Sequence, residues 1–419
     1  MAIDIPINVN LERLRNDLVA LFQIGYDPSS KGVTRLGFSQ EDQAAREWLI
    51  AQFIAAGLHA EIDSAGNVVG RQRIEPPEKV LAIGSHIDSV ISGGMFDGTL
   101  GVLAGLEVLR VLKENRIETD IPVQVYAFAE EEGRFGGMMG AQALIGDITP
   151  EWLLSAHDVN QVMLKDEMKK LGMEPLAALN ARVEPEFLHA FLELHIEQGP
   201  ELDKCGKPIG VVDAISGVFK WIVRLIGKSS HAGTAPMDTR SDAFMGLADF
   251  AHEIPRLISE DGTDKSRLTV GKVDLKPGHP HTIPGEVEFT LVGRDTSNEV
   301  MEELAKSCRK ALSAIARKHH LMFEFEQMSW LKPQPMAPDM IELICTQAQA
   351  LQLDYQVMSS GAGHDAQHLA RVTRTGMIFV PSIGGISHAP DEWTHWQDIE
   401  KGANLLLHSA LALCHGDVV

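Results

Sequence analysis

Histidine and carboxylate side chains follow short apolar stretches at four places in the 419-residue sequence. The first place is the segment 84–88 (GSHID), and the glycine-rich segment 93–98 (GGMFDG) comes soon after it. A neutral imidazole such as that of His86 and a carboxylate such as that of Asp97 suit zinc and similar divalent metals. Asp88 stands two residues after His86, so in an extended chain it points the same way and can accept the second ring N–H. A helix cap followed by a tight turn is the alternative explanation.

Of the other three places, one carries a run of carboxylates and each of the other two carries a histidine. Glu130, Glu131 and Glu132 are consecutive and precede a glycine, whereas His195 and His388 each follow an apolar stretch. A solvated strand end or a structural histidine explains each of these segments when it is taken alone. Taken together, the four places offer about the number of protein ligands that two divalent ions and a shared water need. The candidate ligands are His86, Asp97, Glu131 or Glu132, His195 and His388.

The elements that must position these side chains are apolar strands alternating with helices. Strands are expected at 79–83, 122–129, 190–194 and 375–380, and helices at 11–22 (capped by Asn10), 40–56 and 99–113. Such alternation is typical of a largely parallel α/β sheet covered by helices on both faces. Open sheets of this kind place their functional sites at the carboxyl ends of the strands, where the histidines and carboxylates stand.

The middle of the chain has a different order of elements, β-α-β-β-α-β, which is that of a ferredoxin-like sandwich. The expected elements are a strand at 218–226, a helix from 240 to about 253 that ends near Pro255, strands at 267–275 and 286–292, a helix at 296–320 and a strand at 321–328. Thr296 and Glu299 form a capping box at the start of the last helix. The predicted domains are a catalytic, metal-binding domain of residues 1–216 and 329–419 and an inserted domain of residues 217–328.

Composition narrows the class of protein. The formal charge is −21, from 37 Lys and Arg against 58 Asp and Glu, and so acidic a surface repels phosphate backbones, so nucleic-acid binding is not expected. The sequence contains no run of about 18 apolar residues, so a membrane span is not expected. The first residues do not predict a secretory signal. The four cysteines form no CxxC pair and are expected to be reduced thiols. We therefore expect a cytoplasmic protein that binds neither nucleic acid nor a membrane.

Six motifs occur in a fixed order along the chain: GSHIDS, GGMFDG, AEEEGRF, ELHIEQG, SSHAG and GISHAP. Together they resemble the zinc amidohydrolases of the N-carbamoyl-amino-acid, β-ureidopropionate and allantoate type, a branch of the aminoacylase/carboxypeptidase metallopeptidase superfamily. The resemblance runs from about Leu36 to Leu411 and is specific for the branch but not for the substrate. It implies a catalytic α/β domain of the di-zinc exopeptidase type. It also implies that the inserted domain is a lid through which the chain forms a homodimer.

The resemblance further implies two divalent metal ions per subunit, with zinc first and manganese, cobalt or nickel as alternatives. The implied ligands are His86, Asp97, Glu132, His195 and His388. Asp97 would bridge the two ions, His86 and His195 would share one ion, and Glu132 and His388 would share the other. The bond from Asp97 to Gly98 would be a cis peptide.

Catalytic roles are carried over in the same way. Glu131 would be the general base, and Asp88 would orient His86. If the AEEEGRF motif were aligned on its Arg-Phe pair instead of its glycine, the roles of base and ligand would shift to Glu130 and Glu131. His231 would reach the active site of the partner subunit and stabilise an oxyanion there.

Substrate contacts are implied for Gln198, His281, Arg294, Gly361 and His364. Arg294 suits a bidentate grip on a substrate carboxylate, although an ordinary surface ion pair would also explain an arginine at this position. His281 stands where the family usually has an asparagine, so the substrate could be held differently here. The run 360–365 (SGAGHD), which contains Gly361 and His364, could also be a plain glycine-rich turn.

The expected activity is hydrolysis of the C–N bond of an N-carbamoyl amino acid, which yields the amino acid, ammonia and carbon dioxide. Allantoate or ureidoglycolate is the alternative substrate, and an N-acyl-amino-acid hydrolase or dipeptidase is a further alternative. A metal-bearing binding protein without catalysis is a rival from another class. The intact pair of Glu131 and Glu132 speaks against that rival, because a binding protein has no need of a general base.

Overall fold

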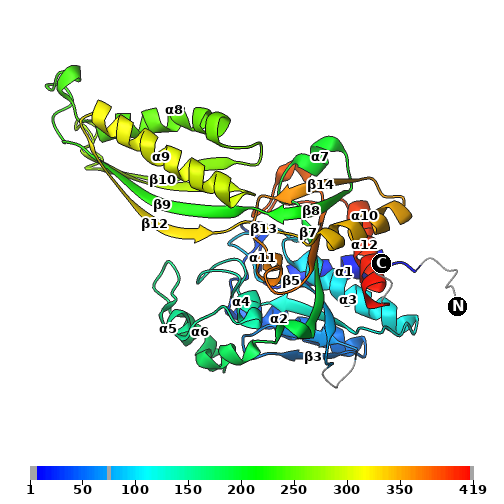
Figure 1. Cartoon of the computed structure of the whole chain (residues 1–419). Coiled ribbons are helices and arrows are strands. Elements are labelled where there is room, and N and C mark those ends of the chain that lie inside the picture. Colours follow the sequence, from blue (N-terminus) through cyan, green and yellow to red (C-terminus); the bar gives the residue numbers. More distant parts are fainter. Residues whose placement is uncertain (1–6, 73–76, 416–419) are drawn as a thin grey trace. The chain divides into compact units, whose positions relative to one another are not determined.

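A computed structural model describes residues 7–72 and 77–415 of the chain. The chain folds into two compact units, one of residues 1–213 with 336–419 and one of residues 214–335 (Figure 1). The segment expected to be inserted, residues 217–328, lies inside the second unit. None of the described helices combines the length and the apolar character that a bilayer span requires.

The first unit is built on a mixed sheet with the strand order β13-β8-β15-β7-β5-β6-β4-β3, in which β14 also pairs with β8. The strands of this sheet are β3 (His59–Ile62), β4 (Val68–Arg71), β5 (Val80–His86), β6 (Val123–Phe128), β7 (Leu188–Ile196), β8 (Ile209–Ile215), β13 (Gln334–Pro335), β14 (Tyr355–Ser360) and β15 (Thr375–Val380). Strand β13 and the last two residues of β8 are counted with residues 214–335. Strands β15, β7, β5 and β6 run parallel to one another. The predicted parallel centre of the sheet is thus confirmed. A separate pair of short strands, β1 (Tyr26–Asp27) and β2 (Gly32–Val33), is antiparallel.

Helices pack on both faces of this sheet. The helices of the unit are α1 (Leu11–Phe22), α2 (Gln40–Ala55), α3 (Thr99–Glu114), α4 (Met139–Ile145), α5 (Pro150–Ser155), α6 (Leu164–Lys170), α7 (Glu201–Cys205), α10 (Pro338–Ala350), α11 (Asp365–Leu369) and α12 (Trp396–Cys414), with short 3-10 turns η1 (Pro175–Ala181), η2 (Pro185–Phe187) and η4 (Ile383–Gly385). Leu194 of β7 joins the core that α3 and α12 help to form. Its neighbour Glu193 accepts a hydrogen bond from the backbone N–H of Ala366 in α11. Because successive side chains alternate across a strand, α11 lies on the opposite face from α3.

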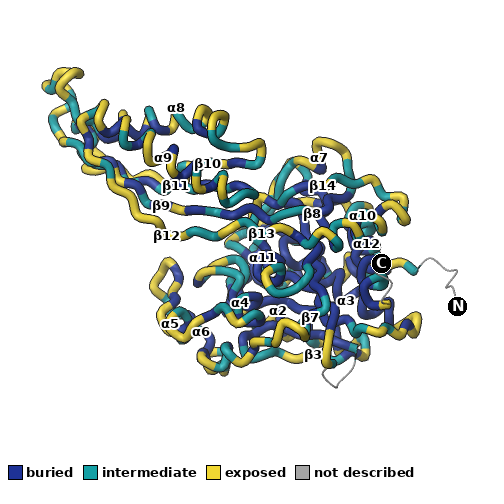
Figure 2. The backbone as a smooth tube through the Cα atoms, in the orientation of Figure 1, coloured by how far each residue is buried: buried dark blue, intermediate teal, exposed yellow. Residues whose placement is uncertain are grey.

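Burial and capping explain why these elements form where they do. Strands β5, β6 and β15 are buried along their whole length, as expected for strands covered on both faces. In Figure 2 the buried, dark blue parts of the tube lie in the middle of this unit, around α3 and β7. Helix α1 begins as predicted, because the side chain of Asn10 accepts a hydrogen bond from the backbone N–H of Arg13. The four cysteines, all in the described part of the chain, are free thiols, as expected.

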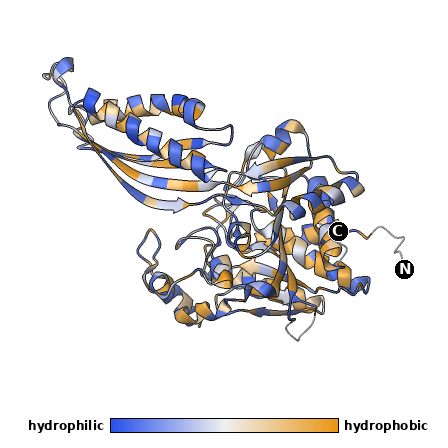
Figure 3. Ribbon diagram, viewed as in Figure 1, coloured by the Kyte–Doolittle hydropathy of each residue, from blue (hydrophilic) through white to orange (hydrophobic). Residues whose placement is uncertain are grey.

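The second unit has the element order β9 (Gly217–Ile226), η3 (Met237–Thr239), α8 (Ala243–Asp261), β10 (Arg267–Lys276), β11 (Glu286–Asp295), α9 (Asn298–Lys318) and β12 (Met322–Leu331). Its antiparallel sheet has the strand order β10-β11-β9-β12. Hydrophobic and hydrophilic residues alternate along helices α8 and α9 (Figure 3). Their apolar residues, such as Phe250 and Leu312, form a core with Trp221 and other strand residues. The unit thus has a hydrophobic core of its own.

Two local expectations in this unit were wrong. Helix α8 does not end near Pro255 but continues through it to Asp261. Phe250 and Leu257 are seven residues apart and both buried, so their packing holds the helix together across the hydrogen bond that proline cannot donate. Helix α9 begins one residue later than a Thr296 cap would allow, because Ser297 is the residue whose side chain accepts the hydrogen bond of the backbone N–H of Val300.

Candidate metal centre

Two neighbouring parallel strands bring the first two histidines together. His86 is the last residue of β5, and His195 is the residue before the end of β7. Since β5 and β7 pair in parallel, both histidines stand at the same edge of the sheet, and their ring centroids are 6.0 Å apart. Both side chains are buried, with exposed fractions of 3% and 1%. The sheet therefore presents two imidazoles to one point inside the protein.

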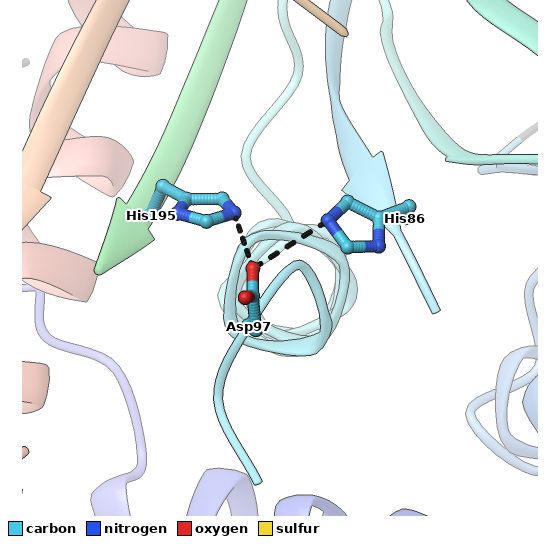
Figure 4. Close-up of side chains that lie close together, drawn as sticks. All are labelled: His86, Asp97 and His195. Atoms are coloured by element: carbon cyan, nitrogen blue, oxygen red, sulfur yellow. Dashed lines mark ion pairs between the residues drawn. The ribbon is translucent and has the colours of Figure 1, made fainter. Parts of the chain in front are cut away.

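The carboxylate of Asp97 lies between these rings (Figure 4). Its Oδ1 atom is 3.7 Å from Nε2 of His86 and 3.2 Å from Nε2 of His195. Its Oδ2 atom is 3.2 Å from Nε2 of His388, which follows strand β15 by way of the turn η4. Glu132 completes the second group, with an Oε2 atom 3.5 Å from Nε2 of His388. One carboxylate thus faces two sets of possible ligands, one with each oxygen.

Ligand atoms gather within 4.8 Å of one another in two sets that share Asp97, namely His86, Asp97 and His195 in one set and Asp97, Glu132 and His388 in the other. A third such set contains Glu193, His195 and His364. In that third set Nε2 of His364 already bonds Ser360 Oγ at 2.9 Å, and both oxygens of Glu193 accept hydrogen bonds. In the two sets that share Asp97, by contrast, Oε1 of Glu132 is buried and has no hydrogen-bond partner among the described residues, so a ligand atom is left over for an ion.

The turn after Asp97 depends on a glycine. Gly98 has a φ of +66°, and a Cβ atom there would lie 2.4 Å from the ring of His86. A side chain at this position would therefore push the histidine out of place. The expected cis bond between Asp97 and Gly98 is not found, since Lys276–Pro277 is the one cis peptide in the described residues. The positive φ of Gly98 makes the turn with a trans peptide.

Backbone contacts set the tautomers of the two buried rings. Nδ1 of His86 lies 3.1 Å from the carbonyl oxygen of Asp88, and Nδ1 of His195 lies 2.9 Å from that of Ile196. A carbonyl oxygen can only accept, so each Nδ1 carries the hydrogen. In the neutral ring each Nε2 then carries the lone pair, which is the form in which imidazole binds a metal. Nε2 of His195 accepts the backbone N–H of Gly98 (3.2 Å).

The carboxylate of Asp88 does something other than expected. Its nearer oxygen is 3.7 Å from Nδ1 of His86, too far for a hydrogen bond. Instead, its two oxygens accept the backbone N–H groups of Glu131 (3.2 Å) and Glu132 (3.1 Å). Asp88 therefore orients His86 through its main chain, and it fixes the glutamate loop through its side chain.

The three consecutive glutamates point in different directions. Glu130 is fully buried, and its oxygens accept the backbone N–H groups of Phe135 (2.6 Å) and Gly137 (3.1 Å), so it holds its own loop. Glu131 places an oxygen 3.6 Å from Nε2 of His86. Glu132 faces His388, and its Oε1 atom is buried without a hydrogen-bond partner in residues 7–72 and 77–415. Glu131 and Glu132 thus both face the histidines, whereas Glu130 does not.

Burial and crowding of negative charge dominate the electrostatics. Burial, together with the charges of Asp365 and Glu132, raises the pKa of Glu131 well above its usual value. Burial, together with the charges of Asp97 and Asp88, raises the pKa of Glu132 in the same way. Burial lowers the pKa of His86 to about 4, so this ring is neutral at physiological pH. Like charges packed this closely resist ionisation unless a cation neutralises them.

Residues expected to contact substrate fall into both units. In the first unit, Nε2 of Gln198 donates to Oδ2 of Asp97 (2.8 Å). His364 is buried, and its ring packs edge-on against His195 with centroids 4.6 Å apart, whereas Gly361 is exposed. Gln198 and His364 therefore adjoin the ligand groups directly.

The remaining expected contacts belong to the second unit. His231 and His281 are exposed and lie on adjacent segments, joined by a bridge between His231 and Thr282 and by a hydrogen bond from Ala232 N to His281 O. Arg294 is in β11 and is partly buried. Burial alone lowers its pKa.

Sequence reasoning missed two buried carboxylates beside the ligands. Glu193 stands two residues before His195, and the alternation of a strand already predicts that both side chains share a face. Glu392 stands four residues after His388, and its carboxylate accepts the backbone N–H groups of Phe96 (2.9 Å) and Asp97 (3.1 Å). No local signal in the sequence indicates that Glu392 meets a segment almost 300 residues away.

The donor set fits divalent cations. It combines neutral imidazole nitrogens with carboxylate oxygens, which are the ligands of zinc and similar metals. Within the described part of the chain, Oε1 of Glu132 and Oε1 of Gln198 are buried side-chain oxygens without a hydrogen-bond partner, and such orphaned acceptors commonly face an ion or a water. The fold and this site together define a metal-binding α/β protein with its centre at the carboxyl ends of parallel strands.

Comparison with known proteins gives the family. The profile described as Peptidase family M20/M25/M40 matches residues 82–412. A protein of Paenarthrobacter aurescens named N-carbamoyl-L-amino-acid amidohydrolase is 39% identical over 407 residues, covering 96% of this chain and 98% of its own length. An allantoate amidohydrolase of Escherichia coli (strain K12) is 35% identical, covering 94% and 96%.

A solved structure agrees with these relatives. A crystal structure of an amidase of the hydantoinase/carbamoylase family from Burkholderia multivorans matches with a TM-score of 0.90 and 35% identity, covering 98% of this chain and 100% of that one. The chain belongs to Peptidase family M20/M25/M40. It is accordingly a metal-binding hydrolase of the amidohydrolase type.

Proposed function

We propose that the enzyme hydrolyses the C–N bond of an N-carbamoyl amino acid with one water, releasing the free amino acid, ammonia and carbon dioxide. The observation that carries this proposal is the position of Asp97, whose two oxygens face two separate sets of ligands. The relative from Paenarthrobacter aurescens, which is matched over almost its whole length, supports the substrate class.

Two divalent cations per subunit fit the two ligand sets. His86, His195 and Asp97 would hold one cation, and Asp97, Glu132 and His388 would hold the other. Zinc is the first choice for imidazole and carboxylate ligands, and manganese, cobalt and nickel also suit them. When bound, such a pair lowers the pKa of a water between the ions and polarises the substrate carbonyl group.

Glu131 would take a proton from that water and later donate it to the departing amino nitrogen. Its oxygen beside His86 and its raised pKa suit a group that must both accept and release a proton. The other alignment, with Glu130 as base, has less support, because both oxygens of Glu130 are bound to backbone N–H groups of its own loop. Gln198 would hold Asp97 in place and adjoin the substrate.

The second unit would serve as lid and dimerisation domain. Its edge strands in the described chain are β10 and β12, and β12 exposes Met322 and Met328, so a second copy could pack or pair there. His231 would donate a hydrogen bond to the oxyanion in the partner subunit. Arg294 would bind the substrate carboxylate through two N–H groups. His281, Gly361 and His364 would each contact the substrate.

Allantoate is the second candidate substrate, because the Escherichia coli relative bears that name at 35% identity. A turnover panel on metal-replete protein separates the candidates. The panel would contain N-carbamoyl-α-amino acids of both hands, N-carbamoyl-β-alanine, allantoate, ureidoglycolate, N-acetyl amino acids and dipeptides. Ammonia release would be measured for the carbamoyl and ureido compounds and free amine for the rest. Turnover of only the N-acetyl compounds and dipeptides would contradict the proposal.

A further inference from the structure

A carboxylate outside the ligand sets joins two loops of the metal centre. Oε1 of Glu392 accepts the backbone N–H groups of Phe96 (2.9 Å) and Asp97 (3.1 Å). Oε2 of Glu392 accepts the hydroxyl hydrogen of Ser387 (2.9 Å), the residue before His388. One side chain therefore ties the loop that carries Asp97 to the loop that carries His388.

Ser387 adds a second link between the same loops. Its Oγ atom also lies 3.1 Å from Oδ2 of Asp97, although its single hydrogen can serve only one carboxylate at a time. Glu392 is 3% exposed, so water cannot readily replace it as acceptor for the two backbone N–H groups. A buried N–H group that loses its partner is costly, and the loop would move to find another.

The neighbouring glycine is shaped for this contact. A Cβ atom on Gly94 would lie 2.3 Å from the carboxylate carbon of Glu392 and 2.4 Å from its Cβ atom. Because the clash would involve the base of the Glu392 side chain as well as its tip, a rotation of the carboxylate would not relieve it. Gly94 thus leaves the space that Glu392 needs to reach the N–H groups of Phe96 and Asp97.

We propose that Glu392 is a positioning residue that holds the Asp97 loop and the His388 loop at the spacing that the metal centre requires. The inference rests on the proposed function, in which Asp97 and His388 are metal ligands. Groups that orient metal ligands in this way commonly change metal affinity by about 10- to 100-fold when they are removed. His388 belongs to only one of the two ligand sets. Binding of the cation beside Glu132 should therefore be weakened more than binding of the other cation.

The test measures zinc binding and stability separately. Full-length protein would be stripped of metal and titrated with zinc against a chromophoric chelator, and its zinc content after gel filtration would be determined by mass spectrometry. Glu392→Ala should lower the affinity for the zinc ion beside Glu132 by about 10- to 100-fold. Glu392→Gln should stay close to wild type, because its amide oxygen can still accept both backbone N–H groups and its NH₂ group can donate to Ser387. Gly94→Ala keeps the carboxylate of Glu392 but should lower zinc affinity, as Glu392→Ala does.

Glu107→Ala is the matched control. Glu107 is another fully buried carboxylate that accepts a backbone N–H group, that of Asn10 (2.8 Å), but it lies in α3 nine residues after Gly98. This variant should lower the melting temperature of the metal-free protein and leave zinc affinity unchanged. Wild-type zinc binding by Glu392→Ala and by Gly94→Ala, or an equal loss in Glu107→Ala, would overturn the inference. A wild-type protein that binds no divalent cation would instead contradict the proposed function, and the inference with it.

Discussion

The ring of His86 touches Asp88 at its backbone carbonyl oxygen and not at its carboxylate. The carboxylate is thereby free to bind the N–H groups of Glu131 and Glu132, 43 and 44 residues further along the chain. A single residue at the end of β5 thus sets both the tautomer of a histidine and the position of the glutamate loop. The two tasks use different atoms of Asp88, so substitution can separate them.

Asp88→Asn should therefore act on the glutamate loop and spare the histidine. The amide offers one oxygen where two are needed, and its NH₂ group would face a backbone N–H group. We expect zinc affinity and turnover to fall by about 10- to 100-fold. Nitrogen NMR of the His86 ring should still show a hydrogen on Nδ1. A change of tautomer with unchanged turnover would contradict the assignment of tasks to the two parts of Asp88.

Glu131→Gln should abolish most turnover without loss of metal. Glutamine keeps the size of the side chain but cannot take a proton, and general base catalysis commonly contributes about 10²- to 10⁴-fold. Initial rates on an N-carbamoyl amino acid and metal content by mass spectrometry are the two measurements. Glu130→Gln is a comparison in the same loop, since Glu130 faces away from the histidines. A larger catalytic loss in Glu130→Gln than in Glu131→Gln would favour the shifted alignment.

Mixed subunits test whether His231 acts across a dimer. His231→Ala and Glu131→Gln should each be nearly inactive alone. If His231 serves the partner subunit, a mixed dimer has one complete site, so random exchange of subunits should restore about a quarter of wild-type activity. The oligomeric state would be followed by light scattering after refolding the mixture. No recovery despite mixed dimers would mean that His231 does not complete the partner's site.

His368 should make stability depend on pH below neutrality. Burial, followed by the charge of Arg371, lowers its pKa to about 4 from the ordinary 6.5, so the unfolded chain binds a proton in this range that the folded chain excludes. Stability should therefore fall as the pH drops from about 6.5 to 4, by about 3 kcal/mol in total. Urea unfolding at several pH values would show a flatter profile for His368→Gln. An identical profile in both proteins would contradict the assignment.

The cytoplasmic location, the dimer and the contacts of His281, Arg294 and Gly361 stay predictions. Each of these predictions concerns a partner subunit, a substrate or the cell, none of which is part of a single chain. The sequence does contain the residues involved. The roles of these residues are determined by the groups that they contact.

The sequence by itself determined the elements and the residue types at their ends. Apolar runs such as those of β5 and β7 form strands because their side chains must leave water, and His86 and His195 then stand at the carboxyl edge of a parallel sheet. The alternation of a strand also places Glu193 on the same face as His195. These features are local, since they depend on neighbours within a few residues.

Tertiary structure alone decided which backbone groups meet which carboxylates. Glu392 reaches Phe96 across 296 residues, and Asp88 reaches the glutamate loop, through contacts that no spacing in the sequence encodes. At Gly98 the structure has a positive φ in place of the expected cis bond, and each of these two conformations can aim the carboxylate of Asp97. A buried N–H group needs an acceptor, but only the folded chain decides which acceptor lies within reach.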